Sequence, residues 1–224
     1  MFEVIIHSVN AQTKELRPKR LFSINDRPVI TANAGEHFAI TVSTSFKTGI
    51  WAVSCFFDDV EMFGYNCLDP ARITKFWTSS CTFKSFLKSD GVGNTVKYPL
   101  SFAKLDVSNH AGEERPSQRY NWNTHKITIK VYEATLKEVS RDTCLRQSTI
   151  PTDTHAANTR DAKIGFSVGV QPSFASEFDK FMWQKGDVVI SKTNKEVYQK
   201  DINYRDSFFM SNTIHCKTSV PIVF

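Results

Sequence analysis

Residues 37–43 read His-Phe-Ala-Ile-Thr-Val-Ser, and this stretch decides the fold class. Large apolar side chains occupy every second position, at Phe38, Ile40 and Val42, and smaller residues occupy the positions between them. Successive side chains of a β-strand point to opposite faces of the sheet, so the alternation predicts a strand with one buried face. Turn-forming residues in segment 31–36 precede the strand and mark its start.

The same period of two recurs along the chain. It predicts further strands at residues 2–6, 51–57, 60–62, 73–78, 81–86, 99–105, 126–132, 187–190, 207–210 and 218–224. Asp58 and Asp59 interrupt the pattern and predict a hairpin turn. Pro99 predicts a strand start or an edge strand, because proline has no N–H to donate. Short strands divided by turns favour an all-β fold, an antiparallel β-sandwich of the jelly-roll type.

Two polar stretches separate the predicted strands. Residues 107–124 and 141–163 contain few apolar residues and many turn formers, which predicts two long surface loops. The composition does not break sharply anywhere, so we expect a single β-sandwich domain over residues 1–224. Its core strands would lie in residues 1–140, and residues 141–224 would supply a long loop, a short helix and a strand arm.

One segment has the spacing of a helix instead of a strand. Phe174, Phe178 and Phe181 recur at i, i+4 and i+7 after the start signal at residues 172–173. We therefore expect one short amphipathic helix over residues 174–183, near the C-terminal end.

The composition excludes several classes of protein. A chain of 224 residues that is 41% hydrophobic and 23% charged can build a core, which excludes a disordered tail, a collagen and a coiled coil. The 28 Lys and Arg and 23 Asp and Glu give a net charge of +5 and are dispersed along the chain. Because no basic stripe is visible, we do not expect nucleic acid as a partner.

Cysteine usage and the missing targeting signals bear on the location. Five cysteines at irregular spacings suit reduced thiols better than a disulfide set or a zinc knuckle; they are Cys55, Cys67, Cys81, Cys144 and Cys216. The N-terminal residues lack the basic start and apolar run of a signal peptide, and no run is long enough for a membrane span. We expect an intracellular (cytoplasmic) or virion protein that is not secreted through a signal peptide and has no membrane span.

Four segments carry a resemblance to a known family. They are Ala-Gly-Glu-His-Phe-Ala-Ile at 34–40, Phe-Phe-Asp-Asp-Val at 56–60, Pro-Leu-Ser-Phe-Ala at 99–103 and Ile-Thr-Ile-Lys-Val-Tyr-Glu-Ala at 127–134. Their order and spacing resemble an uncharacterised β-rich domain that is common in fungal proteins, over roughly residues 1–134. The chain departs from that family at Asp58-Asp59, where the family has Asp-Gly. The resemblance implies a sandwich without an assigned role, and it carries over no catalytic residue.

Candidate chemical groups lack the spacing that chemistry requires. Asp58, Asp59 and Glu61 could hold calcium or act as an acid/base pair, but a hairpin turn, which favours Asp for its own backbone hydrogen bonding, is the preferred explanation of the aspartates. His215 and Cys216 would point to opposite faces of a strand, which separates a base from a thiol.

Metal and phosphate sites are not indicated either. His125, His155 and Cys144 have no metal-ligand spacing, and Gly91-Val92-Gly93 lacks the Lys-Ser/Thr ending of a phosphate loop. We predict that the protein is not an enzyme and has no catalytic residue, cofactor or metal.

The expected role is that of a non-catalytic structural or interaction subunit of a larger assembly. Apolar side chains of the loops and the arm would bind other protein subunits or copies of the chain; they are Trp122, Phe178, Phe181 and Trp183. By analogy with jelly-roll proteins, a capsid or particle component is the most concrete version of this role.

A carbohydrate-binding, lectin-like module is the alternative. Tyr120, Asn121 and Trp122 combine stacking rings with an amide in a predicted loop, as sugar-binding surfaces do.

Overall fold

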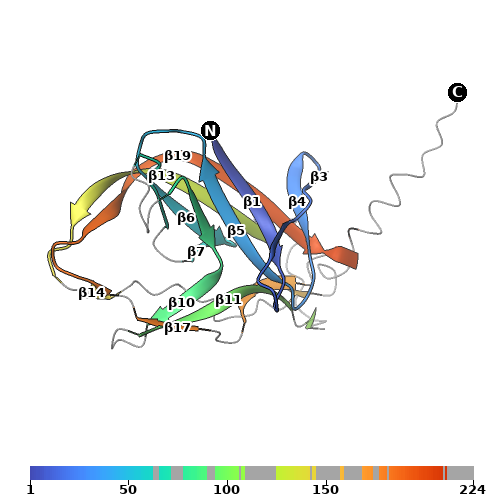
Figure 1. Cartoon of the computed structure of the whole chain (residues 1–224). Helices are drawn as coiled ribbons and strands as arrows, with labels where there is room; N and C mark the ends of the chain where they lie inside the picture. Colours follow the sequence, from blue (N-terminus) through green and yellow to red (C-terminus); the bar gives the residue numbers. More distant parts are fainter. Residues whose placement is uncertain are drawn as a thin grey trace, which may run out of the picture.

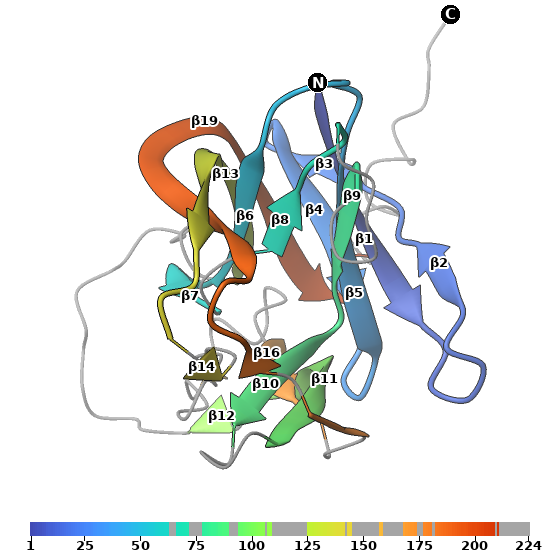
Figure 2. The same cartoon turned by 60° about the vertical axis from the view of Figure 1, so that its left-hand side comes forward.

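The protein is an all-β sandwich of two sheets, seen in a computed structural model (Figure 1). The structure describes residues 1–62, 66–71, 78–89, 94–105, 107–108, 125–141, 143–144, 157–158, 168–173, 177–180, 182–208 and 210. The predicted all-β class and the sandwich are therefore confirmed. In Figure 2, β1, β5 and β9 lie in one layer, and β6, β13 and β19 lie in the other.

The first sheet has eight strands, with the order β10-β11-β5-β1-β2 along its main path. They are β1 (Phe2–Val9), β2 (Leu16–Pro18), β5 (His37–Thr44), β9 (Ser80–Phe83), β10 (Ser85–Ser89), β11 (Asn94–Lys104), β16 (Val168–Pro172) and β17 (Glu177–Lys180). β1 and β5 pair antiparallel along their whole length, with Val4 opposite Val42 and Ile6 opposite Ile40. The register thus places the alternating apolar residues of both strands on one face.

The second sheet has seven strands in the order β3-β4-β19-β13-β6-β7, with β8 also paired to β6. They are β3 (Phe22–Ile24), β4 (Arg27–Ala32), β6 (Trp51–Phe57), β7 (Val60–Glu61), β8 (Asn66–Leu68), β13 (Lys126–Glu138) and β19 (Val188–Asp206). Two small sheets add β12 (Val107–Ser108) with β15 (Ala157–Asn158), and β14 (Thr143–Cys144) with β18 (Met182–Trp183).

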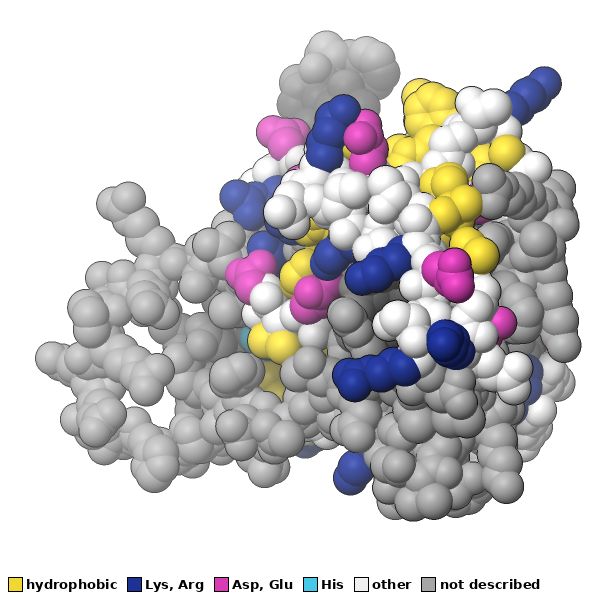
Figure 3. All heavy atoms as spheres, turned by 90° about the vertical axis from the view of Figure 1, so that its left-hand side faces the viewer, with side chains coloured by type: hydrophobic (Ala, Val, Ile, Leu, Met, Phe, Trp, Pro, Cys, Tyr) yellow, Lys and Arg dark blue, Asp and Glu magenta, His cyan; other side chains and the backbone are white. Residues whose placement is uncertain are grey.

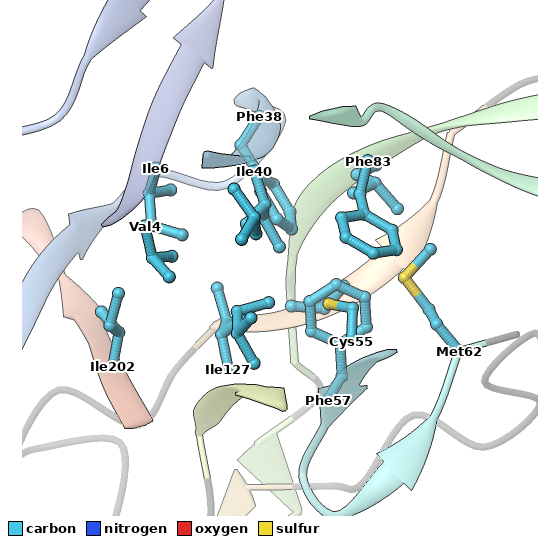
Figure 4. Close-up of a cluster of buried hydrophobic side chains, with 14 of the residues drawn as sticks. Val4, Ile6, Phe38, Ile40, Cys55, Phe57, Met62, Phe83, Ile127 and Ile202 are labelled. Carbon is cyan, nitrogen blue, oxygen red and sulfur yellow. The ribbon is translucent and has the colours of Figure 1, made fainter. Parts of the chain in front are cut away.

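The core lies between the two large sheets (Figure 4). Val4, Ile6, Phe38, Ile40 and Phe83 from the first sheet meet Cys55, Phe57, Ile127 and Ile202 from the second. The ring of Phe38 stacks on that of Phe102, with the centroids 4.3 Å apart and the planes 18° from parallel. Burial of this apolar surface is the main force that holds the two layers together.

The strand order differs from that of the predicted jelly roll, which is not confirmed. Jelly-roll neighbours run antiparallel, whereas β4 pairs with β19 in parallel from Val29–Asn203 to Ala32–Asp206. A sheet ordered β19-β13-β6 that faces β1 paired with β5 has the strand order of immunoglobulin-type sandwiches. The topology is set by which distant strands pair, and alternation within each strand does not encode it.

The predicted helix over residues 174–183 is wrong where the structure describes it. Residues 177–180 form β17, whose Phe178 lies opposite Val96 of β11, and residues 182–183 form β18. The open edge of β11 offers these residues a ladder of backbone hydrogen bonds, and this tertiary pairing overrides the helical spacing of three phenylalanines.

Two strand predictions are also corrected. β11 begins at Asn94, so Pro99 lies inside a strand. It lies where the neighbouring ladder changes from β17, paired to residues 94–97, to β16, paired to residues 100–104. A residue without an N–H fits that interruption. The predicted strand at 207–210 is wrong, because Ser207 and Phe208 are helical. The strand predicted at 218–224, and most of 73–78, lie outside the described residues.

The hairpin at Asp58-Asp59 is confirmed. Both residues have positive φ, 50° and 67°, as the two central positions of a type I′ turn require. The Asp58 carboxylate also bonds to residues outside the turn. It accepts hydrogen bonds from the Lys126 amide at 2.9 Å and from the Tyr204 hydroxyl at 3.3 Å. These bonds connect the turn to the start of β13 and to the end of β19.

Replacing Tyr204 by phenylalanine tests this buried hydroxyl. Tyr204 is fully buried, and burial together with the Asp58 carboxylate raises its pKa well above 10.0. Tyr204→Phe should lower the free energy of unfolding by about 1 kcal/mol at neutral pH. Above pH 10 the unfolded tyrosine ionises while the folded one keeps its proton, so the wild type should lose stability there and the variant should lose less. Urea titrations at pH 7 and above pH 10 measure both effects; parallel pH profiles would contradict the assignment.

Candidate functional site

Four aromatic rings gather where β1 and β6 begin, and we call this group the aromatic end. Phe2 begins β1, Trp51 begins β6, Tyr198 lies in β19, and Phe46 lies in the loop that joins β5 to β6. Three strands from both sheets and one loop therefore converge at one end of the sandwich. Figure 3 shows apolar side chains gathered at the top of the molecule, the end at which this loop lies in Figures 1 and 2.

The four rings pack against one another, and one of them, Phe46, is partly exposed to solvent. Phe2 meets Phe46 and Trp51 edge-on, each at 5.4 Å between centroids, and lies 5.5 Å from Tyr198. Phe46 lies 5.6 Å from Trp51, and 47% of its surface is exposed. Phe2 itself is buried, and burial raises the pKa of Tyr198. The aromatic end thus has a buried base and one solvent-facing ring held on top of it.

Hydrogen bonds and a close glycine–indole contact hold the loop that carries Phe46 in place. The amide of Phe46 donates to Thr44 Oγ1 at 3.2 Å, and the amide of Ser45 donates to the Met1 carbonyl at 3.0 Å. Gly49 has a φ of +107°, and a Cβ atom there would lie 2.4 Å from the Trp51 ring. Only glycine suits both the backbone conformation and the close approach of the indole. The exposed ring is therefore presented from an ordered loop.

Such an arrangement is suited to burying an apolar group of a partner. Half-exposed aromatic side chains that are already held in place lose little conformational entropy on binding, so most of the burial energy is retained. Because the rings meet edge-on or tilted, they do not form the flat platform on which sugar rings stack. The chemistry of the aromatic end favours a protein surface over a carbohydrate.

The outer face of the second sheet has a different character. Its lysines are matched by acids: Lys130 with Glu196 at 3.1 Å, Lys192 with Glu61 at 2.9 Å and Lys195 with Glu133 at 2.6 Å. Lys192 also donates to the buried Ser54 hydroxyl at 3.2 Å and lies over the Tyr132 ring. Ion pairs that remain accessible to solvent contribute little to stability or to binding.

The three acids near the hairpin do not converge on one point. Asp58 bonds to the Lys126 amide, Asp59 pairs with Lys126 Nζ at 3.0 Å, and Glu61 pairs with Lys192. Within the described part of the chain, no group of three or more potential ligands is placed to hold a metal ion. The predictions of no metal and no cofactor stay predictions.

The described thiols are poor nucleophiles. Cys55, Cys67 and Cys81 are free, and burial raises the pKa of Cys67 to about 12 and those of Cys55 and Cys81 well above the ordinary value. All three thiols are therefore protonated at neutral pH. Only the deprotonated thiolate attacks an electrophile or binds a metal. His125 lies beside Tyr204, with the two rings 5.5 Å apart. His155 and Cys216 lie outside the described residues.

The predicted partner-binding residues are not brought together in the described structure. Phe178 belongs to β17 beside β11, and Trp183 belongs to β18, opposite Thr143 of β14. Phe181 and Trp122 lie outside the described residues, as do Tyr120 and Asn121 of the carbohydrate alternative. Both sets stay predictions.

The sequence does contain a signal for the aromatic end. Residues 45–49 read Ser-Phe-Lys-Thr-Gly, which places one large apolar residue in an otherwise polar turn between two predicted strands. A phenylalanine in such a turn has no core position available, so it faces either solvent or a partner. Its contacts with Phe2 and Tyr198, far apart in the sequence, could not be foreseen.

The described part of the chain contains no helix long and apolar enough to cross a membrane. Comparison with protein-family models, with curated proteins and with solved structures finds no match for this chain. The resemblance to the fungal β-rich domain therefore stays a prediction, and the function is inferred from the geometry of the aromatic end.

Proposed function

We propose that the protein is a non-catalytic subunit of a larger assembly, in which copies of the chain contact one another through the aromatic end. The observation that carries the proposal is the half-exposed Phe46 ring held over the buried Phe2 and the partly buried Trp51. Interfaces are enriched in aromatic anchors of this kind, and a few such residues supply most of the binding energy.

The magnitude is consistent with a specific contact. Covering the exposed half of Phe46 contributes about 0.7–1.5 kcal/mol, since full burial of such a side chain contributes roughly 1.5–3 kcal/mol. Met1, 82% exposed, is joined to the same loop through its carbonyl and extends the apolar surface. Symmetric contact between two copies uses each such anchor twice, which doubles its contribution.

The proposed role is coarser than a capsid or particle component. That version depends on an analogy with jelly-roll proteins, and a jelly roll is not confirmed for this chain. A rigid two-sheet frame with an ordered aromatic loop at one end supports the role of an interaction subunit without specifying the assembly.

A serine at position 46 tests the proposal. Phe46→Ser should weaken self-association about 10- to 150-fold, as a total loss of about 1.5–3 kcal/mol from the two copies implies, and leave the fold unchanged. Sedimentation equilibrium over a range of concentrations measures the association. Val60→Ser is the matched control, because Val60 is 51% exposed but lies at the hairpin, at the far end of β6.

Equal association constants for the two variants would contradict the proposal. So would a wild-type chain that stays monomeric at every concentration tested. Circular dichroism of both variants shows whether the sandwich is retained.

A further inference from the structure

One edge of β19 is unpaired in the middle of the strand. The Tyr204 amide donates to the His125 carbonyl at 2.9 Å, so the backbone groups of even-numbered residues in this part of β19 face β13. Those of Gln199 and Asp201 therefore face the opposite edge. There β4 pairs only with residues 203–206, and in the described part of the chain no other strand pairs with this edge.

The regular part of the open edge is short. The register between β19 and β13 shifts just beyond Tyr198, between the pair Val131–Tyr198 and the pair Tyr132–Glu196. A bulge of this kind bends the strand and interrupts further pairing. Residues 198–202 are therefore the part of the edge at which a strand of a second copy could add.

Lys200 lies on the core face of this edge. It is directly opposite Ile129 of β13, and the next such pair along the strands, Ile127 with Ile202, lies in the core (Figure 4). Directly opposite residues share a face, so the side chain of Lys200 starts on the buried side of the sheet and is only partly exposed. Among the described residues, no carboxylate pairs with its amino group. The amino group therefore depends on water at the open edge for its hydrogen bonds.

Asp201 lies on the outer face of the same edge. Its Oδ1 atom accepts hydrogen bonds from Thr128 Oγ1 at 2.8 Å and from Gln199 Nε2 at 3.1 Å. The open edge thus has a positive charge on one face and a negative charge on the other. Charged side chains on an edge strand, above all those that point inward, are a known means by which sheets avoid pairing with other chains.

These two charges oppose each two-fold pairing that residues 198–202 allow between copies. Edge-facing backbone groups must lie opposite one another, so two antiparallel copies can be centred on position 199, 200 or 201. Centring on 200 places two lysines opposite each other on the core face, and centring on 201 places two aspartates opposite each other on the outer face. Centring on 199 covers both Lys200 side chains with the Tyr198 rings of the other copy. Like charges that face each other destabilise a strand pair, and a covered amino group without an acceptor loses its hydration.

We propose that Lys200 and Asp201 determine which surface the copies use, because they prevent pairing through the edge of β19. The inference rests on the proposed self-association, which it directs to the aromatic end. Tyr198 belongs both to the aromatic end and to the open edge, so the two surfaces are neighbours and one must be excluded if the contact is to be specific.

Removing both charges should make the edge associate. Lys200→Val and Asp201→Thr are introduced together into a Phe46→Ser chain, in which the aromatic end has lost its exposed anchor. β-Branched side chains then replace the like charges, so self-association should become at least about tenfold tighter than in Phe46→Ser alone. Sedimentation equilibrium measures the association. Hydrogen–deuterium exchange locates it, because the edge-facing amides at positions 199 and 201 should exchange more slowly in the associated sample.

Two matched controls separate charge from added apolar surface, both in the same Phe46→Ser chain. Asn194→Thr with Lys195→Val makes the same kind of exchange at exposed positions beyond the register shift, and it should leave the association unchanged. Lys200→Glu with Asp201→Lys again places like charges opposite each other, so it should also leave the association unchanged.

Equal association of the charge-free variant and the two controls would overturn the proposal. So would tighter association without slower exchange at positions 199 and 201. Every chain in this comparison carries Phe46→Ser, so these results do not depend on the aromatic end. A failure of the proposed function would appear elsewhere, as equal association of Phe46→Ser and the wild type.

Discussion

Phe38→Ala should lower the free energy of unfolding by about 3–5 kcal/mol, the largest effect that we expect from one substitution. Phe38 is 1% exposed, stacks on Phe102 and meets the Phe57 ring edge-on at 6.0 Å. Phe102 belongs to the first sheet and Phe57 to the second, so the substitution removes a contact between the two layers. The cavity left behind adds to the lost transfer energy, because close-packed neighbours relax only in part.

Urea denaturation measures this loss. The slope of the unfolding free energy against urea concentration should stay unchanged. Domains have total stabilities of about 5–15 kcal/mol, so Phe38→Leu, with an expected loss nearer 1 kcal/mol, provides a milder variant at the same position. Phe208→Ala is the surface control, because Phe208 is 76% exposed, and it should change the stability by less than about 0.5 kcal/mol. Equal losses for Phe38→Ala and Phe208→Ala would show that Phe38 is not in the core.

Gly49→Ala should lower the free energy of unfolding by about 2–3 kcal/mol. Two effects add: a side chain at a φ of +107° is strained, and its Cβ would lie 2.4 Å from the Trp51 ring. That ring is held between Phe2 and Phe46, so it cannot move aside without disturbing the aromatic end. The variant should therefore lose self-association together with stability.

Gly35→Ala separates the two effects. Gly35 has a φ of +83°, but nothing lies within 4 Å of the Cβ that alanine would add. It should show the backbone cost alone, about 1 kcal/mol. Similar losses at both glycines would mean that the indole yields freely and that the aromatic end is not fixed.

Local pattern predicted much of the frame. The alternation at residues 37–43 gives β5, and the two aspartates give the turn between β6 and β7, because strand faces and turn conformations depend on neighbours in the sequence. β19 shows where prediction from the local pattern fails. The pattern indicated only 187–190, of which 188–190 belong to this strand of nineteen residues, since residues 192–196 are polar on both faces. Pairing of Lys192 with Ala134 and of Glu196 with Tyr132 of β13 holds this segment in the sheet, across a register shift.

The aromatic end could not be predicted either, because it depends on strand pairing between distant segments. Phe2, Phe46, Trp51 and Tyr198 come from four separate places in the sequence, and only the pairing of β1 with β5 and of β13 with both β6 and β19 brings them together. The sequence indicated other aromatic residues, Trp122 and Trp183 among them, because they lie in predicted loops and arms. The helix predicted at 174–183 is wrong for the same reason, because the pairing of β17 with β11 joins segments far apart in the sequence.

Hydrogen–deuterium exchange at increasing protein concentration tests the central claim most directly, because it locates the surface that a second copy covers. We predict that exchange slows at residues 44–51, which carry Phe46 and Gly49, while the hairpin at Asp58-Asp59 keeps its rate. Unchanged exchange at 44–51 in a sample that is demonstrably associated would place the interface elsewhere and contradict the account.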